Sequence, residues 1–131
     1  MMKNKLLNAD IIEVISKMGH TDEIVIGDAG LPIPDGVKRI DLALTQGHPA
    51  FIGVLEALLN SYECEGFILA EEIKEKNAEI EKQVISLLSG KSVEYVSHEA
   101  FKERTKNAKA VIRTGECSPY ANVILKSGVI F

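Results

Sequence analysis

The feature that most constrains the fold of this chain is a regular alternation of short apolar segments with amphipathic ones. Strand-like segments lie at 23–28, 37–44, 64–70, 93–97, 108–115 and 121–131, and helical periodicity covers 8–17, 51–62, 71–90 and 98–107. Strands that alternate with helices at this interval predict a three-layer α/β/α sandwich, with a largely parallel sheet covered on both faces. The last two strand segments leave no room for a crossover helix, so we expect a mixed sheet.

Cap and turn residues mark the ends of the first two elements. Asn8 fits the N-cap position of the first helix, and Gly19 fits its C-terminal stop. The strand at 23–28 leads into AGLPIPDG, where the prolines and glycines exclude regular structure. We therefore expect Asp28 to lie at the end of this strand, where a rigid loop begins.

The length of 131 residues fits one domain over 1–131. Hydrophobic residues make up 46% and charged residues 26% of the chain, as in ordinary globular proteins. The net charge of -4, with basic residues scattered among acidic ones, offers no stripe for neutralising phosphates. We therefore expect no nucleic-acid partner.

The expected compartment is the cytoplasm. Asp10 and Glu13 interrupt the apolar residues near the N-terminus, so we expect no signal peptide, and we expect no membrane-spanning segment. Cys64 and Cys117 lie far apart without metal-type spacing, which favours free thiols in a reducing compartment. The apolar ending at 127–131 is unusual for a chain terminus and indicates docking, for example against another subunit.

Ligands of open α/β sheets gather beyond the carboxyl ends of the parallel strands, where loops and helix N-termini meet. Asp28, His98 and the loop at 115–122 follow such strand ends. His20 instead precedes the first strand, so topology alone does not bring it to the same edge. Histidine is nevertheless the side chain that titrates unaided near neutral pH, which makes His20 a candidate acid or base.

Each candidate also has a purely structural interpretation. His20 follows a helix-ending glycine, where an imidazole can cap carbonyl groups. Asp28 can bond backbone amides within its turn, and His98 can simply begin a helix. Tyr120 and Asn122 can be core and turn residues. The residues alone leave both interpretations open.

Three weaker patterns do not indicate a cofactor or a metal. His20, His48 and His98 lack the short spacing of a zinc site. SGKS at 89–92 lacks the earlier glycine of a phosphate-binding loop, and GDAG at 27–30 is only a fragment of a dinucleotide fingerprint. We expect neither a metal nor an organic cofactor.

Four strings with unusual composition occur along the chain. They are GHTDEIVIGDAGLPIPDG at 19–36, YVSHEAF at 95–101, AVIRTGECSPYAN at 110–122 and GVIF at 128–131. In order and separation they resemble the family of D-ribose pyranases and fucose mutarotases, and the chain resembles the ribose pyranases more closely. The resemblance extends from Leu6 to Phe131. Gly27 departs from it, because alanine is expected there.

The resemblance implies a role for each matching residue. His20 matches the proton donor of the family, and Asp28 matches a carboxylate that binds the sugar. His98 matches a further substrate contact, and Tyr120, Ala121 and Asn122 match the segment that holds the sugar hydroxyls. The resemblance also implies a homodecamer of two pentameric rings, with sites near subunit boundaries.

The implied reaction is an isomerisation of D-ribose between its β-pyranose and β-furanose forms. It breaks the bond between C1 and the ring oxygen and remakes it with another hydroxyl, so general acid/base catalysis suffices without a cofactor. Asp28 would either hold His20 protonated or orient a hydroxyl. Two alternatives remain, which are a non-catalytic sugar-binding accessory of ribose uptake and a mutarotase for fucose or another sugar.

Overall fold

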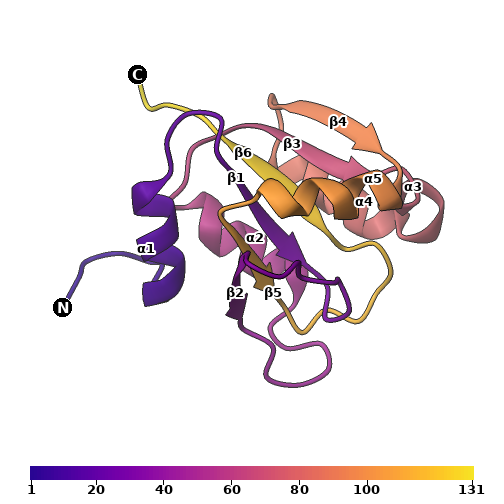
Figure 1. Ribbon diagram of the computed structural model, residues 1–131, viewed down its shortest axis with the longest axis horizontal. Coiled ribbons are helices and arrows are strands. Elements are labelled where there is room, and N and C mark those ends of the chain that lie inside the picture. Colours follow the sequence, from indigo (N-terminus) through magenta and orange to yellow (C-terminus); the bar gives the residue numbers. More distant parts are fainter.

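Six strands form one mixed sheet in the order β2-β5-β1-β6-β3-β4 in the computed structural model, which describes residues 1–131 (Figure 1). The strands are β1 (Glu23–Gly27), β2 (Lys38–Asp41), β3 (Cys64–Ala70), β4 (Ser92–Val96), β5 (Ala110–Arg113) and β6 (Val123–Ser127). The helices are α1 (Ala9–Lys17), α2 (Phe51–Leu59), α3 (Ile73–Lys76), α4 (Ala78–Leu87), α5 (His98–Arg104) and the short 3-10 helix η1 (Thr105–Asn107).

The sheet is largely parallel, as predicted. β2, β5 and β1 pair in parallel, and so do β3 and β4. β6 lies between β1 and β3 and is antiparallel to both. The chain between β5 and β6 is a loop without a crossover helix, which is why β6 enters the sheet in the opposite direction.

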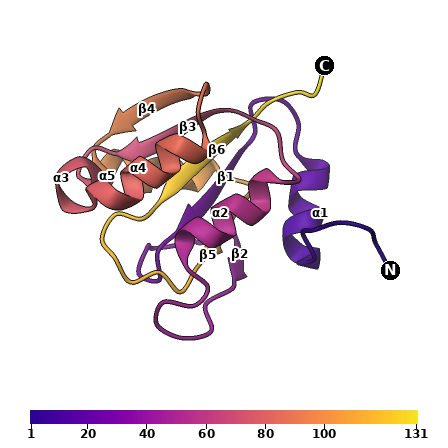
Figure 2. The same ribbon diagram turned by 180° about the vertical axis from the view of Figure 1, so that it is seen from behind.

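Helices cover both faces of the sheet, which confirms the α/β/α layers. Ile24 and Ile26 of β1 pack with α1, α2 and α4 in the larger core cluster. Val25 points to the opposite face and packs with Phe101 of α5 in a smaller cluster. Figure 1 shows α5 in front of the sheet, and Figure 2 shows α2 and α4 on the other side. The two faces are therefore covered unequally.

The first helix begins as predicted, whereas the third predicted helical segment is broken in the structure. Asn8 Oδ1 accepts a hydrogen bond from Ile11 N at 3.0 Å, as expected for the N-cap of α1. The segment at 71–90, predicted as one helix, is two helices separated at Asn77, whose φ of -154° is extended. The Asn77 side chain donates to Ser118 Oγ and Pro119 O, so a contact with a distant loop accompanies this break.

The apolar C-terminus does not pack onto its own chain. β6 ends at Ser127, and the strand character expected up to 131 is absent beyond it. Ile130 is 91% exposed and Phe131 is 100% exposed. Both cysteines are free thiols, as predicted, with Cys64 buried and Cys117 exposed. No helix has the length and the apolar character needed to span a membrane.

Candidate functional site

The candidate residues fall at two opposite ends of the sheet. Asp28 follows β1, His98 follows β4, and the loop at 114–122 follows β5, so all three lie beyond the carboxyl ends of parallel strands. Figure 1 shows the loops after β1 and β5 at the end of the sheet away from both chain termini. We call this end the carboxyl edge. His20 lies before β1, at the opposite end, which we call the amino edge.

Asp28 and Asn122 are joined at the carboxyl edge. Asp28 N donates to Asn122 Oδ1 at 2.8 Å, although the two residues are 94 positions apart. The Asp28 carboxylate also accepts from Gly30 N at 2.8 Å, so its expected turn role is present as well. Asn122 is fully buried, and its Nδ2 has no hydrogen-bond partner. A buried amide of this kind can still donate to a bound hydroxyl.

Gly27, the residue before Asp28, lies beside this contact and occupies the position where the family resemblance suggests alanine. A Cβ on Gly27 would stand 2.7 Å from Leu31 Cδ2 and 3.2 Å from Asn122 Oδ1. Glycine therefore leaves room for Leu31 to pack beneath the loop. No functional group is lost by this departure.

His98 and Tyr120 meet at the same edge. Their ring centroids are 5.1 Å apart with an interplanar angle of 85°, an edge-to-face contact. His98 Nδ1 is buried and has no hydrogen-bond partner. Tyr120 has a φ of 57°, in the left-handed region that few non-glycine residues occupy. Ala121 is fully buried and has an apolar side chain, so the only polar groups at this position are those of its backbone.

Several residues that the sequence did not single out hold these loops in position. Glu72 accepts from His98 N with both carboxylate oxygens, at 3.1 and 3.0 Å. Asn77 bonds to Ser118 and Pro119, next to Tyr120. Glu116 accepts from Phe51 N at 3.1 Å and so supplies the cap that Ala50 cannot give α2. In the sequence, only the polarity of these side chains hints at such roles, because their partners lie far away along the chain.

His20 is held differently. Its side chain is 54% exposed, and Nε2 lies 2.6 Å from Glu65 Oε2. The hydrogen bond from His20 and the nearby ammonium of Lys126 hold the pKa of Glu65 below its ordinary value. Thr21, the next residue, has a φ of 71°, which is a rare conformation for a β-branched side chain. Glu65 is not identified as a functional residue by the sequence alone, although it is the only charged residue in the apolar segment 64–70.

Asp28 is not the carboxylate that accompanies His20 within one chain. The whole of β1 separates them, and a strand advances about 3.3 Å per residue, so the two residues lie on opposite edges. The anionic neighbour of His20 is Glu65. Within one chain, Asp28 is therefore left with the second role considered for it, which is to orient a hydroxyl.

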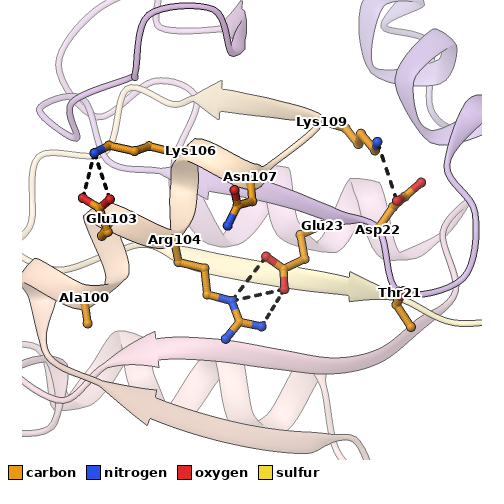
Figure 3. A pocket seen from close by; sticks show the side chains of 9 residues that line it. All are labelled: Thr21, Asp22, Glu23, Ala100, Glu103, Arg104, Lys106, Asn107 and Lys109. Carbon is orange, nitrogen blue, oxygen red and sulfur yellow. Dashed lines mark hydrogen bonds and ion pairs between the residues drawn. The ribbon is translucent and has the colours of Figure 1, made fainter.

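A cavity of about 630 Å³ lies beside the amino edge, between the start of β1 and the helices α5 and η1 (Figure 3). Glu23 and Arg104 form an ion pair of 2.7 Å across it, and this pairing raises the pKa of Arg104. Thr21 lines the cavity, but Asp28, His98 and Asn122 do not. No group of three or more His, Cys, Asp or Glu residues is arranged to hold a metal ion.

Comparisons with known proteins find relatives that match this chain over its full length. A D-ribose pyranase from Bacillus cereus is 56% identical over 131 residues, which is the full length of both chains. The structure of Bacillus subtilis RbsD complexed with D-ribose superposes with a TM-score of 0.98 at 51% identity, with full coverage of both chains. The fucose mutarotase from Streptococcus pneumoniae, in complex with L-fucose, superposes with a TM-score of 0.84 at 27% identity, again with full coverage.

The family model described as the RbsD / FucU transport protein family matches residues 1–130. This match covers both edges of the sheet and every candidate residue. The chain is more similar to the ribose-named relatives than to the fucose mutarotase. The chain therefore belongs to the RbsD / FucU family.

Proposed function

We propose that this protein is a D-ribose pyranase, an isomerase that interconverts the β-pyranose and β-furanose forms of D-ribose by general acid/base catalysis. The observation that carries the proposal is the pair of buried, unpartnered polar atoms at the carboxyl edge, His98 Nδ1 and Asn122 Nδ2. An unpaired buried polar group costs about 1–3 kcal/mol, which a sugar hydroxyl would relieve. Relatives with 56% identity carry the name of this activity.

The reaction needs proton transfer and orientation. When the ring opens, the bond between C1 and the ring oxygen breaks, the ring oxygen gains a proton, and the hydroxyl on C1 loses one. Closure through a different hydroxyl reverses these transfers. Ring opening already occurs in water, so a positioned acid/base worth roughly 10² to 10⁴ in rate is sufficient without a cofactor.

The proposed roles follow the chemistry of each side chain. His20 is the catalytic acid/base, and its exposed ring is free to meet a substrate. Asp28, His98, Tyr120 and Asn122 bind the sugar hydroxyls, and Ala121 contributes backbone groups. Asn122 both fixes the Asp28 backbone and offers its Nδ2 to the sugar.

The site is proposed to form between copies of the chain. His20 lies on the opposite edge from the sugar-binding residues, so a neighbouring copy has to bring the two edges together. The exposed apolar side chains of Ile130 and Phe131 offer such a copy an apolar surface to bury. We propose a homodecamer of two pentameric rings. Light scattering tests it, and a mass near the 14.3 kDa of one chain would contradict it.

The proposed compartment is the cytoplasm. The free thiol of Cys117 is exposed, and such thiols persist in a reducing compartment. Fractionation of cells that express the protein tests this location. Recovery of the protein outside the cytoplasmic fraction would contradict it.

Saturation-transfer NMR on equilibrated ribose tests the activity. The protein should accelerate exchange between the pyranose and furanose signals, and unchanged exchange would exclude the proposed function. Tight binding of ribose without faster exchange would instead identify a sugar-binding accessory. Parallel measurements with fucose and galactose distinguish a ribose pyranase from a mutarotase for other sugars.

A further inference from the structure

We propose that Glu65 is the positioning residue for His20, and that its bond to Nε2 leaves Nδ1 as the nitrogen that exchanges a proton with the sugar. This inference rests on the proposed acid/base role of His20. The distance of 2.6 Å between His20 Nε2 and Glu65 Oε2 is that of a charge-assisted hydrogen bond. A carboxylate only accepts hydrogen bonds, so Nε2 must carry the hydrogen.

The two protonation states of the ring then have defined roles. In the neutral ring, the Nε2 hydrogen points to Glu65 and Nδ1 carries the lone pair, which makes Nδ1 the base. In the charged ring, Nδ1 carries the second hydrogen and is the acid. Glu65 remains ionised in both states, because His20 and Lys126 hold its pKa low. It therefore fixes the ring orientation without taking part in the proton transfer.

A β-bulge aims Glu65 at His20. In the pairing of β3 with β6, Cys64 lies opposite Ser127 and Gly66 lies opposite Lys126, so Glu65 is the extra residue on β3. Bulges are common beside active sites, where they redirect a side chain. A Cβ on Gly128 would lie 3.2 Å from Glu65 N, so the backbone at Gly128 passes close to the bulge.

The backbone around His20 is fixed to the same end of β6. Thr21 N donates to Ser127 O at 2.9 Å, and Ser127 N donates to Asp22 O at 2.8 Å. Gly19 N donates to the Asp22 carboxylate at 2.8 Å. The backbone is thus held on both sides of His20, and Glu65 supplies the contact that holds the exposed ring.

The charges around this pair are balanced. Lys126 Nζ lies 3.3 Å from the other oxygen of Glu65, and Lys109 Nζ lies 3.7 Å from Asp22. Glu65 bonds to the His20 ring and Asp22 bonds to Gly19 N, and Lys126 and Lys109 are their basic partners. Of these side chains, only Glu65 bonds to the imidazole.

The test is Glu65→Gln, which keeps the size of the side chain but loses its charge. We expect kcat for ribose exchange to fall roughly 10- to 100-fold, because a misoriented ring loses its near-attack geometry. KM should stay within about twofold, because Glu65 is not proposed to touch the sugar. Glu65→Asp, which keeps the charge, should recover part of the loss. Unchanged kcat in Glu65→Gln would overturn the inference.

The pH dependence gives a second readout. Glutamine mimics a protonated Glu65, so the advantage of the wild type over Glu65→Gln should be full at neutral pH. It should disappear as the pH falls through the lowered pKa of Glu65. Exchange is measured from neutral pH down to the lowest pH at which circular dichroism still shows the native fold. A ratio of rates that already falls well above the ordinary glutamate pKa of about 4.3 would contradict the role of the charge.

Two controls separate this inference from the proposed function. Glu63→Gln removes a nearby carboxylate that pairs with Lys91 and not with His20, and it should leave exchange unchanged. In a His20→Ala background, Glu65→Gln should have no further effect, because both changes act through one ring. If His20→Ala itself exchanges ribose normally, the proposed function of His20 fails. If only Glu65→Gln is neutral, the inference alone fails.

Discussion

At the carboxyl edge Asn122 is fully buried and bonded to the backbone of Asp28, whereas at the amino edge the His20 ring is 54% exposed and bonded to Glu65. Both edges contain a non-glycine residue with positive φ, Tyr120 in one and Thr21 in the other. At the carboxyl edge, buried contacts within one chain therefore hold the proposed sugar-binding residues. At the amino edge, the proposed acid/base is exposed on the surface of the chain.

This difference predicts that substitutions at the two edges have different consequences. A change at the carboxyl edge should reduce both stability and sugar binding, because the same buried atoms serve both. A change at the amino edge should reduce the rate and leave stability intact, because exposed side chains contribute little to folding.

The largest effect is expected for His20→Ala. Loss of the acid/base should slow ribose exchange by roughly 10² to 10⁴. The thermal midpoint should hardly change, because the ring is mostly exposed. Saturation-transfer NMR and thermal denaturation measure the two quantities. His48→Gln, at another exposed histidine, is the matched control and should behave as the wild type.

A smaller effect on rate, but the largest on stability, is expected for Asn122→Ala. The change leaves Asp28 N unpartnered in a part-buried site, which should cost about 1–3 kcal/mol in the free energy of unfolding. Ribose binding should weaken as well, because Nδ2 is lost. Urea denaturation and calorimetry check these expectations, with exposed Asn60→Ala as the control. Wild-type stability in this variant would show that the hydrogen bond from Asp28 N to Asn122 does not stabilise the carboxyl edge.

Asn77→Ala tests whether the carboxyl edge is held from outside the sugar site. The substitution removes two hydrogen bonds, to Ser118 and Pro119, and each is worth about 0.5–1.5 kcal/mol. We expect a loss of stability of that order and a several-fold weaker affinity for ribose, although Asn77 is not proposed to touch the sugar. An unchanged affinity would mean that the loop before Tyr120 keeps its conformation without this contact.

The smallest effect is expected for Thr21→Gly. A left-handed conformation costs an L-residue about 1–2 kcal/mol, and glycine gives back roughly 0.5–1 kcal/mol through its greater freedom in the unfolded chain. The net result should be a stabilisation of at most about 1.5 kcal/mol, measured by thermal denaturation. Tyr120→Gly relieves the same strain but loses the ring beside His98, so it should bind ribose more weakly.

The parts of the fold that depend on local pattern could be predicted. The apolar segment 64–70 is β3 to the residue, and Asn8 caps α1 because side chain and backbone are neighbours in sequence. The break at Asn77 could not be predicted, because its partners in the loop at 118–119 are about 40 positions away. Long-range polar contacts of this kind have no local signature.

The candidate site divides in the same way. Topology predicted that Asp28, His98 and the loop at 115–122 share an edge, because parallel strands end together. The partner of His20 was not predicted, because the direction of the Glu65 side chain depends on a bulge between β3 and β6. A period-two pattern cannot show where an extra residue enters a strand.

The central claim is that the two edges act together from two copies of the chain. One variant carries His20→Ala, and the other carries Asp28→Asn together with His98→Ala. The two are co-expressed with different tags, and mixed assemblies are isolated through both tags in turn. If each site combines His20 of one chain with the carboxyl edge of a neighbour, each half is unmutated in half of the chains. About one quarter of the sites in a random equal mixture are then intact. The account predicts that ribose exchange recovers to about that fraction of the wild-type rate. Exchange no faster than that of either variant alone would contradict it.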